Sequence, residues 1–291
     1  MLWLSGKADG HQQGEVAARD GAGIPFREWW QPQARAVIVY LHGQGGHSGA
    51  FTAMGDDLYG KGFNVYAYDH RGFGLSREQR GDIASYDLFV EDAVEIIRHV
   101  QRRNPGLPVF LLGLSMGGHI AMRTAYRAGD LLAGVIALSP GFKLRTPPPW
   151  PTIVKAVLLA LLTPRRYMDP VSGSVITTRN QAYTDGAKQD EHWVRTFTAR
   201  FHLGTVRSIR QARKEIRHVH VPVLMLQAGD DFLVCPTESR RFFDAIRYPD
   251  KEFRLLDGLC HNLVAEPEMP QIAADIAAWI DERVEAGQQA L

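Results

Sequence analysis

Along most of the chain, short apolar runs alternate with stretches in which apolar residues recur every three or four positions. A run of four to eight apolar residues predicts a buried strand, and the wider spacing predicts an amphipathic helix. We expect strands at residues 24–30, 36–41, 63–68, 109–112, 134–138, 223–227 and 252–256. We expect helices near residues 50–61, 86–103, 117–128, 238–246 and 270–284. This alternation is typical of an α/β fold, with a mostly parallel sheet and helices on both of its faces.

One long stretch interrupts the alternation. After the strand at 134–138 come a proline-rich segment at 147–151, an apolar segment at 153–162 and a polar passage dotted with aromatic residues. Regular patterning resumes only near residue 221, and connections of this length between core strands are uncommon. The insertion could be an extra helical layer, or a cap over a ligand site. We favour a cap, because the insertion leaves from the carboxyl ends of the strands, where such sheets bind ligands.

This interpretation divides the chain into a core, residues 1–140 and 219–291, and a cap, residues 141–218. The apolar segment at 153–162 either packs on the core or offers an apolar face to lipid. Peripheral membrane contact through the cap is therefore a hypothesis that the sequence leaves open.

Composition excludes several classes of function. The 291 residues are 45% hydrophobic and 22% charged, which is ordinary for a globular enzyme. The formal net charge is +1, and no basic stripe is present, so we expect no nucleic-acid partner. No C-x-x-C or H-E-x-x-H spacing occurs, so we expect no metal. Two cysteines, Cys235 and Cys260, are too few for a disulfide framework.

The sequence also bears on location. It contains no apolar run of about 18 residues, so we expect no transmembrane helix. Its first apolar residues are interrupted by Lys7 and Asp9, unlike those of a signal peptide. We therefore expect a cytoplasmic protein.

The strongest chemical signal lies at residues 113–117, which read Gly-Leu-Ser-Met-Gly between a predicted strand and a predicted helix. A G-x-S-x-G turn in this position presents its serine, here Ser115, above the end of the sheet. The helix that follows points backbone N–H groups and the positive end of its dipole at an oxyanion forming there. The alternative is a glycine-rich turn with an incidental serine, but the strand–turn–helix context favours a nucleophile.

A serine nucleophile needs a base that is oriented by a carboxylate, and in such folds the chain order is serine, acid, histidine. Asp231 follows the strand at 223–227, and His261 follows the strand at 252–256. We assign Asp231 as the acid and His261 as the base. Asp230 is an alternative acid that could equally cap a turn, and Asp257 is a weaker one.

The oxyanion needs two N–H donors. One is the residue after the nucleophile, Met116, and the other comes from the glycine-rich loop after the strand at 36–41. We choose Gln44 as that second donor. His42, in the same loop, is interpreted as a brace that holds the loop by hydrogen bonds.

Five segments together resemble the α/β-hydrolase superfamily, within it the monoacylglycerol lipase and lysophospholipase branch of serine aminopeptidase-like hydrolases. They are His-Gly-Gln-Gly at 42–45, Asp-His-Arg-Gly-Phe-Gly-Leu-Ser at 69–76, Gly-Leu-Ser-Met-Gly-Gly at 113–118, Gly-Asp-Asp-Phe-Leu-Val at 229–234 and Gly-Leu-Cys-His at 258–261. The resemblance covers residues 15–140 and 220–285. Two positions depart from the branch, which has an acidic residue at Gly46 and an aromatic residue at Cys260.

The resemblance implies an α/β-hydrolase fold whose mostly parallel sheet has eight strands, with an inserted helical cap. It implies a triad of Ser115, Asp231 and His261, oxyanion donors at Gln44 and Met116, and no cofactor.

The function expected from these residues is hydrolysis of a carboxylic ester through an acyl-enzyme. The favoured small-molecule substrate is a monoacylglycerol or a similar single-chain lipid ester, and the alternatives are lysophospholipids, small esters and thioesters. Hydrolases with an aspartate nucleophile are disfavoured because Ser115 stands at that position. A ligand-binding protein without activity remains the alternative from another class, since fold alone never proves catalysis.

Overall fold

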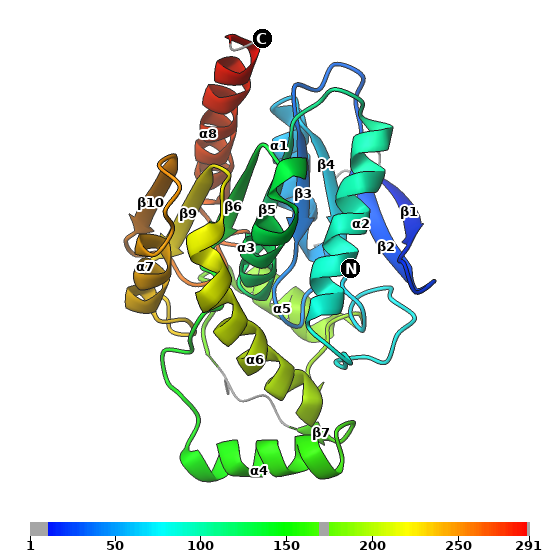
Figure 1. Ribbon diagram of the computed structural model, residues 1–291, viewed down its shortest axis with the longest axis vertical. Helices are drawn as coiled ribbons and strands as arrows, with labels where there is room; N and C mark the ends of the chain where they lie inside the picture. Colours follow the sequence, from blue (N-terminus) through cyan, green and yellow to red (C-terminus); the bar gives the residue numbers. More distant parts are fainter. Residues whose placement is uncertain (1–10, 169–174, 290–291) are drawn as a thin grey trace.

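The computed structural model describes residues 11–168 and 175–289, which form an eight-stranded sheet of order β1-β2-β4-β3-β5-β6-β9-β10 (Figure 1). The strands are β1 (Gln12–Ala17), β2 (Gly23–Trp29), β3 (Val37–Leu41), β4 (Asn64–Tyr68), β5 (Val109–Leu114), β6 (Gly134–Leu138), β9 (Val223–Ala228) and β10 (Lys251–Leu256). β2 runs antiparallel to both of its neighbours, β1 and β4, and from β4 to β10 all neighbours are parallel. The expected mostly parallel sheet is therefore confirmed.

The central strands explain why the apolar runs were informative. Every residue of β3, β5, β6 and β9 is buried, because helices cover both faces of the sheet. All of the expected strands are present, with ends that differ by a few residues. The additional strand, β1, was not predicted from the pattern. It lies at the sheet edge, pairs only with β2 and is largely exposed, so its sequence carries no apolar run.

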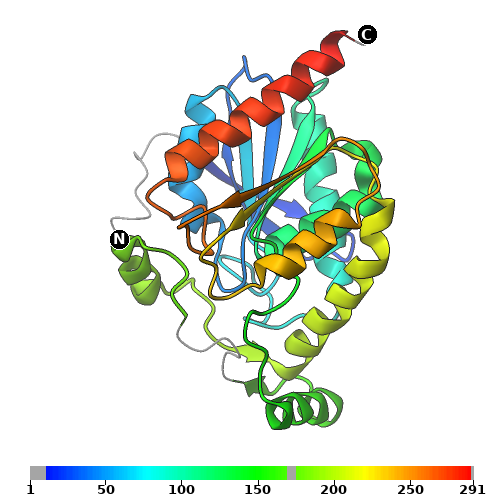
Figure 2. The same cartoon turned by 90° about the vertical axis from the view of Figure 1, so that its left-hand side faces the viewer.

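The five expected helices are α1 (Thr52–Gly60), α2 (Asp87–Arg103), α3 (Met116–Ala128), α7 (Pro236–Asp244) and α8 (Met269–Gln289). α1 and α8 pack on one face of the sheet, and α2, α3 and α7 pack on the other. Figure 2 shows α8 lying across its face. In α2 the buried residues Phe89, Ala93, Ile96 and Val100 form the helical stripe that the sequence periodicity predicted.

The β6–β9 segment, residues 139–222, contains the elements that the sequence pattern did not resolve. They are α4 (Trp150–Leu162), β7 (Tyr167–Met168), α5 (Gln181–Gln189), β8 (Phe197–Thr198) and α6 (Ala199–Glu215). β7 and β8 pair antiparallel as a separate two-stranded sheet. α4 packs against α6 and lies at the end of the molecule opposite to the C-terminal end of α8 (Figure 1).

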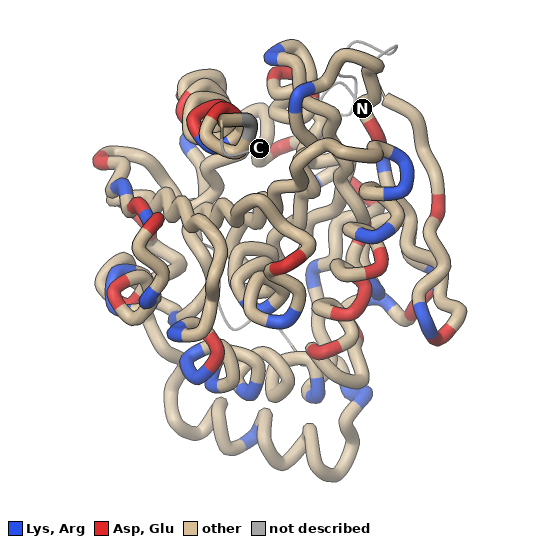
Figure 3. The backbone as a smooth tube through the Cα atoms, turned by 45° about the horizontal axis from the view of Figure 1, so that its top comes forward, with Lys and Arg blue, Asp and Glu red and all other residues tan. Residues whose placement is uncertain are grey.

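α4 is an exposed apolar helix. None of its residues is buried, and the side chains of Trp150, Leu161 and Leu162 are 75%, 65% and 77% exposed. Lys155 is its one charged residue, and the helix at the bottom of Figure 3 is almost entirely tan. The alternative that residues 153–162 pack on the core is therefore wrong. Within the described ranges, no helix has the length and apolar character needed to cross a bilayer.

A buried ion pair joins the β6–β9 segment to the core helix α3. The guanidinium of Arg123, which is 1% exposed, donates to Glu215 of α6 over 2.8 and 3.2 Å. A third N–H of Arg123 donates to the Ser208 hydroxyl over 3.0 Å, and His119 Nε2 lies 2.9 Å from the same oxygen. Each charged group is thus paired and hydrogen-bonded, as buried charges require.

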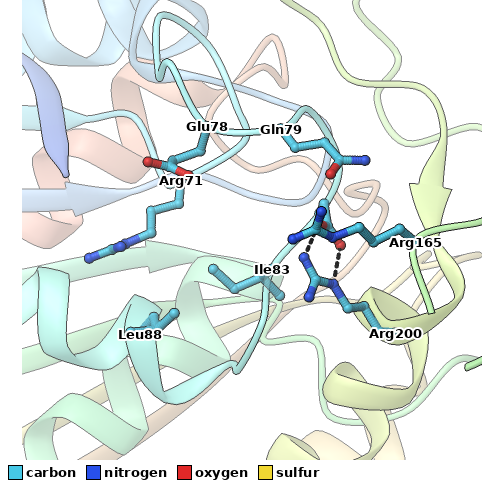
Figure 4. A pocket seen from close by; sticks show the side chains of 8 residues that line it. Arg71, Glu78, Gln79, Ile83, Leu88, Arg165 and Arg200 are labelled. Carbon is cyan, nitrogen blue, oxygen red and sulfur yellow. Dashed lines mark hydrogen bonds and ion pairs between the residues drawn. The ribbon is translucent and has the colours of Figure 1, made fainter. Parts of the chain in front are cut away.

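A second attachment holds the start of α6. The buried carboxylate of Asp82 accepts hydrogen bonds from the Thr198 hydroxyl and from Arg200 Nε, both over 2.6 Å. This pair borders a cavity of about 120 Å³, shown in Figure 4 with Arg71 and Leu88 on one side and Arg165 beside Arg200 on the other. α6 is therefore fixed to the core at both of its ends.

We expect Glu215→Ala to lower the free energy of unfolding by about 3 kcal/mol, because Arg123 would keep its buried charge and lose its main partner. Lys188→Ala is the control. It removes the exposed Lys188–Asp185 pair and should cost less than about 1 kcal/mol. Urea unfolding of both variants measures the difference, and equal losses would contradict the role given to the buried pair.

Burial, aided by the charge of Arg123, lowers the pKa of His119 from 6.5 to about 3. Between these values the unfolded chain binds a proton that the folded chain does not, so stability falls as the pH falls. We expect His119→Asn to reduce the slope of unfolding free energy between pH 6 and 4 by about 1.4 kcal/mol per pH unit. Urea titrations at several pH values measure this slope for both proteins. A slope that is the same in His119→Asn and the wild type would refute the prediction.

Candidate active site

Ser115 occupies a tight turn between β5 and α3. Its φ of 54° lies in the left-handed region, which side chains rarely adopt. The turn forms because its glycines permit close backbone approach: a Cβ on Gly117 would lie 2.0 Å from the Leu41 carbonyl oxygen, and one on Gly113 would lie 2.3 Å from that of Gly117. The sequence pattern thus places Ser115 at the carboxyl end of the central strand and the N-terminus of α3.

Asp231 lies in the loop after β9 and His261 in the loop after β10, and the two side chains form a hydrogen bond. His261 Nδ1 lies 2.7 Å from Asp231 Oδ2, and both side chains are buried. Three further donors hold the same carboxylate, namely the N–H groups of Leu233 and Val234 and the side-chain amide of Gln227. Because the carboxylate accepts at Nδ1–H, the lone pair of the imidazole lies on Nε2. Among the described residues, no group hydrogen-bonds that buried Nε2.

The three aspartates considered as the acid differ in burial. Asp231 is fully buried against His261, whereas Asp230 and Asp257 are exposed. The backbone N–H of Asp230 donates to the Leu259 carbonyl, which joins its loop to the loop that carries His261. The geometry therefore brings His261 together with Asp231 and with neither alternative.

Ser115, His261, Gln44 and Met116 all line one cavity of about 1100 Å³. Its lining is mostly apolar, and its walls come from the core on one side and from the β6–β9 segment, including α4 and α6, on the other. This volume reaches the upper end of the range of ordinary small-molecule sites. The four residues predicted to contact substrate thus line one cavity, and Asp231 binds the far side of the His261 ring.

The loop that carries Gln44 is held beside Ser115. His42 Nδ1–H donates to the Gly43 carbonyl over 2.8 Å, and its Nε2 accepts the N–H of His70 over 3.0 Å. Burial lowers the pKa of His42 to about 4, so the ring stays neutral and can play both roles. The prediction that His42 braces this loop is confirmed. A Cβ on Gly43 would lie 3.4 Å from the Ser115 Cβ.

Sequence reasoning missed two residues that hold the same loop. The carboxylate of Asp69, at the end of β4, accepts the N–H groups of Ser48 and Leu75 over 2.6 and 2.8 Å. His47 Nε2 lies 2.6 Å from Asp190 Oδ2 in the β6–β9 segment, and both side chains are 2% exposed. Asp69 stood in a recognised motif, but nothing near Asp190 in the sequence marks it as a partner.

The His261 loop also depends on a residue that the sequence did not single out. Glu266, which is buried, accepts the N–H of Cys260 over 3.1 Å and pairs with Arg179 of the β6–β9 segment over 2.8 Å. The N–H of Asn262 donates to the Thr177 carbonyl over 2.6 Å. Burial raises the pKa of the Cys260 thiol, which fits a packing role and not a reactive one.

The described residues contain no group of three or more histidine, cysteine, aspartate or glutamate side chains arranged to hold a metal ion. The groups that meet at the cavity are a serine at a helix N-terminus and an imidazole paired to a carboxylate.

Comparison with known proteins places this geometry in a family. The family model described as serine aminopeptidase, S33, matches residues 32–268. The human protein named monoglyceride lipase is 30% identical over 267 residues, which cover 89% of this chain and 87% of that protein. Phospholipase YtpA of Bacillus subtilis is 28% identical over 263 residues, covering 88% of this chain and 99% of that protein.

A solved structure agrees. The crystal structure of the monoacylglycerol lipase of Paleococcus ferrophilus matches with a TM-score of 0.78 and 27% identity, covering 89% of this chain and 99% of that one. The matched region spans β3 to β10 and the loops that carry Gln44, Ser115, Asp231 and His261. The chain therefore belongs to the serine aminopeptidase S33 family, a family of lipases and esterases with the α/β-hydrolase fold.

Proposed function

We propose that this protein hydrolyses single-chain lipid esters, monoacylglycerols foremost, through an acyl-enzyme on Ser115. One observation carries the proposal: Ser115 and His261 line the same large apolar cavity, while Asp231 binds the far side of the histidine ring. The names of the relatives, monoglyceride lipase and phospholipase, support a lipid ester as the substrate class.

In the first half-reaction, Ser115 Oγ attacks the ester carbonyl as His261 Nε2 takes its proton. Asp231 holds the ring by accepting Nδ1–H and stabilises the imidazolium that forms. His261 then gives the proton to the leaving alcohol. The four hydrogen bonds to Asp231 fix the carboxylate before reaction, so little reorganisation is needed when charge develops.

The tetrahedral oxyanion would be bound by the backbone N–H groups of Gln44 and Met116. Met116 is the first residue of α3, where the helix dipole also favours negative charge. In the second half-reaction water replaces serine as the nucleophile, with His261 again acting as base. Because both donors are main-chain groups, changing the Gln44 side chain should cost far less than the roughly 10²–10³-fold loss typical of a removed donor.

We infer that residues 141–218 act as the cap of this site. The support is that α4 and α6 supply much of the cavity wall, through residues such as Ile153, Val157 and Leu203. An apolar wall of this kind suits an acyl chain, whose burial contributes about 0.8 kcal/mol per methylene group.

Ester hydrolysis tests the proposal. We expect p-nitrophenyl esters from C2 to C16 to give maximal rates at medium or long chains, and 1- and 2-monoacylglycerols to be cleaved. Ser115→Ala should lower kcat by about 10⁶-fold, and Asp231→Asn by about 10⁴-fold. Rates on both substrate series, measured with purified wild type and variants, give the comparison.

A peak at C2–C4 with monoacylglycerols untouched would retain the mechanism and replace the lipid substrate by small esters. Turnover confined to thioesters would move the substrate to that class. No Ser115-dependent turnover of any ester, with the variants correctly folded, would support the ligand-binding alternative.

The cap is also proposed to touch membranes through α4, whose apolar side chains are exposed. We expect the protein to float with phospholipid vesicles in a density gradient. The variant Leu161→Asp/Leu162→Asp should remain in the dense bottom fraction. Leu255→Asp, which alters a 50% exposed leucine on β10, is the control and should float normally. Absence of wild-type flotation, with and without anionic lipid, would end this proposal.

A further inference from the structure

Gln227 is a fully buried polar residue in an otherwise apolar strand. Val223 and Met225 of β9 belong to the core on one side of the sheet, and Gln227 takes the next position on that face. Its side-chain oxygen Oε1 is buried and accepts no hydrogen bond from the residues that the structure describes. Burying an acceptor without a partner costs stability, so the presence of this amide calls for another reason.

The amide nitrogen of Gln227 has two acceptors. Nε2 donates to Oδ2 of Asp231 and to the carbonyl of Ala228, each over 3.1 Å. An amide nitrogen carries two hydrogens, so both of them are used. Gln227 does not line the cavity. Any effect that it has on the reaction must therefore pass through Asp231.

The two oxygens of the Asp231 carboxylate have different partners. Oδ1 accepts the backbone N–H groups of Leu233 and Val234 over 2.9 and 2.7 Å. Oδ2 accepts from His261 Nδ1 over 2.7 Å and from Gln227 Nε2 over 3.1 Å. Within the described part of the chain, Gln227 is thus the one other side chain that shares an oxygen with the imidazole.

A strained turn fixes the peptide that follows Gln227. Ser139, directly after β6, has a φ of 39°, and its hydroxyl accepts the N–H of Ala228 over 3.2 Å. The residue before it, Leu138, accepts the N–H of Ser115 over 2.9 Å. The end of β9 is therefore tied through β6 to the turn of the nucleophile, which places Gln227 relative to Ser115 as well as to the acid.

Two charged side chains also reach the loops of the acid and the base. The guanidinium of Arg145 donates to the backbone carbonyl of Asp231 over 2.8 Å, and the carboxylate of Glu266 accepts the N–H of Cys260 over 3.1 Å. Both of these contacts are with backbone groups, and neither involves the Asp231 carboxylate. The neutral amide of Gln227 is the group that acts on the oxygen facing the imidazole.

We propose that Gln227 is a positioning residue for the hydrolysis, because its amide fixes Oδ2 of Asp231 and limits how strongly that oxygen stabilises a proton on His261. A hydrogen bond to a carboxylate disperses its negative charge, so the imidazolium beside it is stabilised less. The amide thereby keeps His261 able to accept the Ser115 proton over a wider range of pH. This inference rests on the proposed ester hydrolysis and adds a residue to it.

Gln227→Met replaces the amide by an apolar side chain of similar length. Without the amide, Oδ2 stabilises the imidazolium more strongly, so His261 stays protonated, and inactive as a base, up to a higher pH. We expect the acidic side of the kcat/KM–pH profile for a p-nitrophenyl ester to move up by about 0.5–1 pH unit. At the plateau, kcat should fall about 3- to 10-fold with little change in KM, because Asp231 is held less firmly.

Asn104→Leu is the matched control. Asn104 is also a buried amide, and it bonds Asn64, the first residue of β4, outside the cavity lining. This variant should lose stability in urea unfolding and keep the pH profile of the wild type. If it moves the profile as far as Gln227→Met does, or if Gln227→Met changes neither the profile nor kcat, the inference is wrong while the proposed hydrolase function stands.

A measurement on the wild type requires neither a folded variant nor turnover. Because His261 and Gln227 donate to the same oxygen, protonation of the imidazole should shift the side-chain amide resonance of Gln227. In NMR spectra recorded across pH, we expect the Gln227 and His261 signals to titrate with one midpoint, while the side-chain amide of Asn104 stays unchanged. A Gln227 signal that does not respond while His261 titrates would overturn the inference. Coupled titration without Ser115-dependent hydrolysis would support the shared oxygen and contradict the proposed function.

Discussion

The site depends on one backbone constraint, the left-handed conformation of Ser115 between β5 and α3. A side chain in this region stores on the order of 1–3 kcal/mol of strain, which the surroundings must offset. They do so by close backbone packing: Gly113 meets Gly117, and Gly117 meets Leu41 at the end of β3. The Ser115 N–H also donates to the Leu138 carbonyl of β6. Three parallel strands and one helix therefore fix the direction of a single hydroxyl group.

The β6–β9 segment is tied to both loops that flank this serine. It reaches the glycine-rich loop through His47–Asp190 and the His261 loop through Arg179–Glu266. It reaches α3 through Arg123–Glu215. Two of these pairs, His47–Asp190 and Arg123–Glu215, are buried on both sides. Removing one partner of such a pair is strongly destabilising, so these pairs hold geometry more than they add net stability. By contrast, α4 packs on α6 with its apolar side chains exposed, so it is the part of the segment least held by the core.

Charge and apolar surface are separated inside the cavity. The aliphatic wall lies where α4 meets α6, and the basic wall lies toward α7 and the start of the β6–β9 segment. The cations that line the cavity are all exposed to solvent, namely Lys143, Arg195, Arg207, Arg210 and Arg213. The aliphatic wall offers surface that an apolar ligand can bury.

Local signals in the sequence determined most of the core. Central strands buried on both faces must be continuously apolar, and core helices must repeat with their period, so both could be predicted from pattern alone. The order of Ser115, Asp231 and His261 along the chain was also sufficient to nominate them, since each follows a predicted strand. The exposed edge strand β1 gave no such pattern and was missed.

Only the tertiary structure decided those features that depend on residues distant in the sequence. Asp230 and Asp231 are neighbours with identical side chains, and only packing buries one of them against His261. Asp190 pairs with His47, which is 143 positions away in the sequence, and Glu266 pairs with Arg179, which is 87 positions away. No local sequence pattern encodes such pairings. The apolar sequence of α4 was compatible with burial or exposure, because a helix that is apolar on all sides has no preferred face. Only the arrangement of α4 and α6 around the cavity settled which side chains meet solvent and which meet the site.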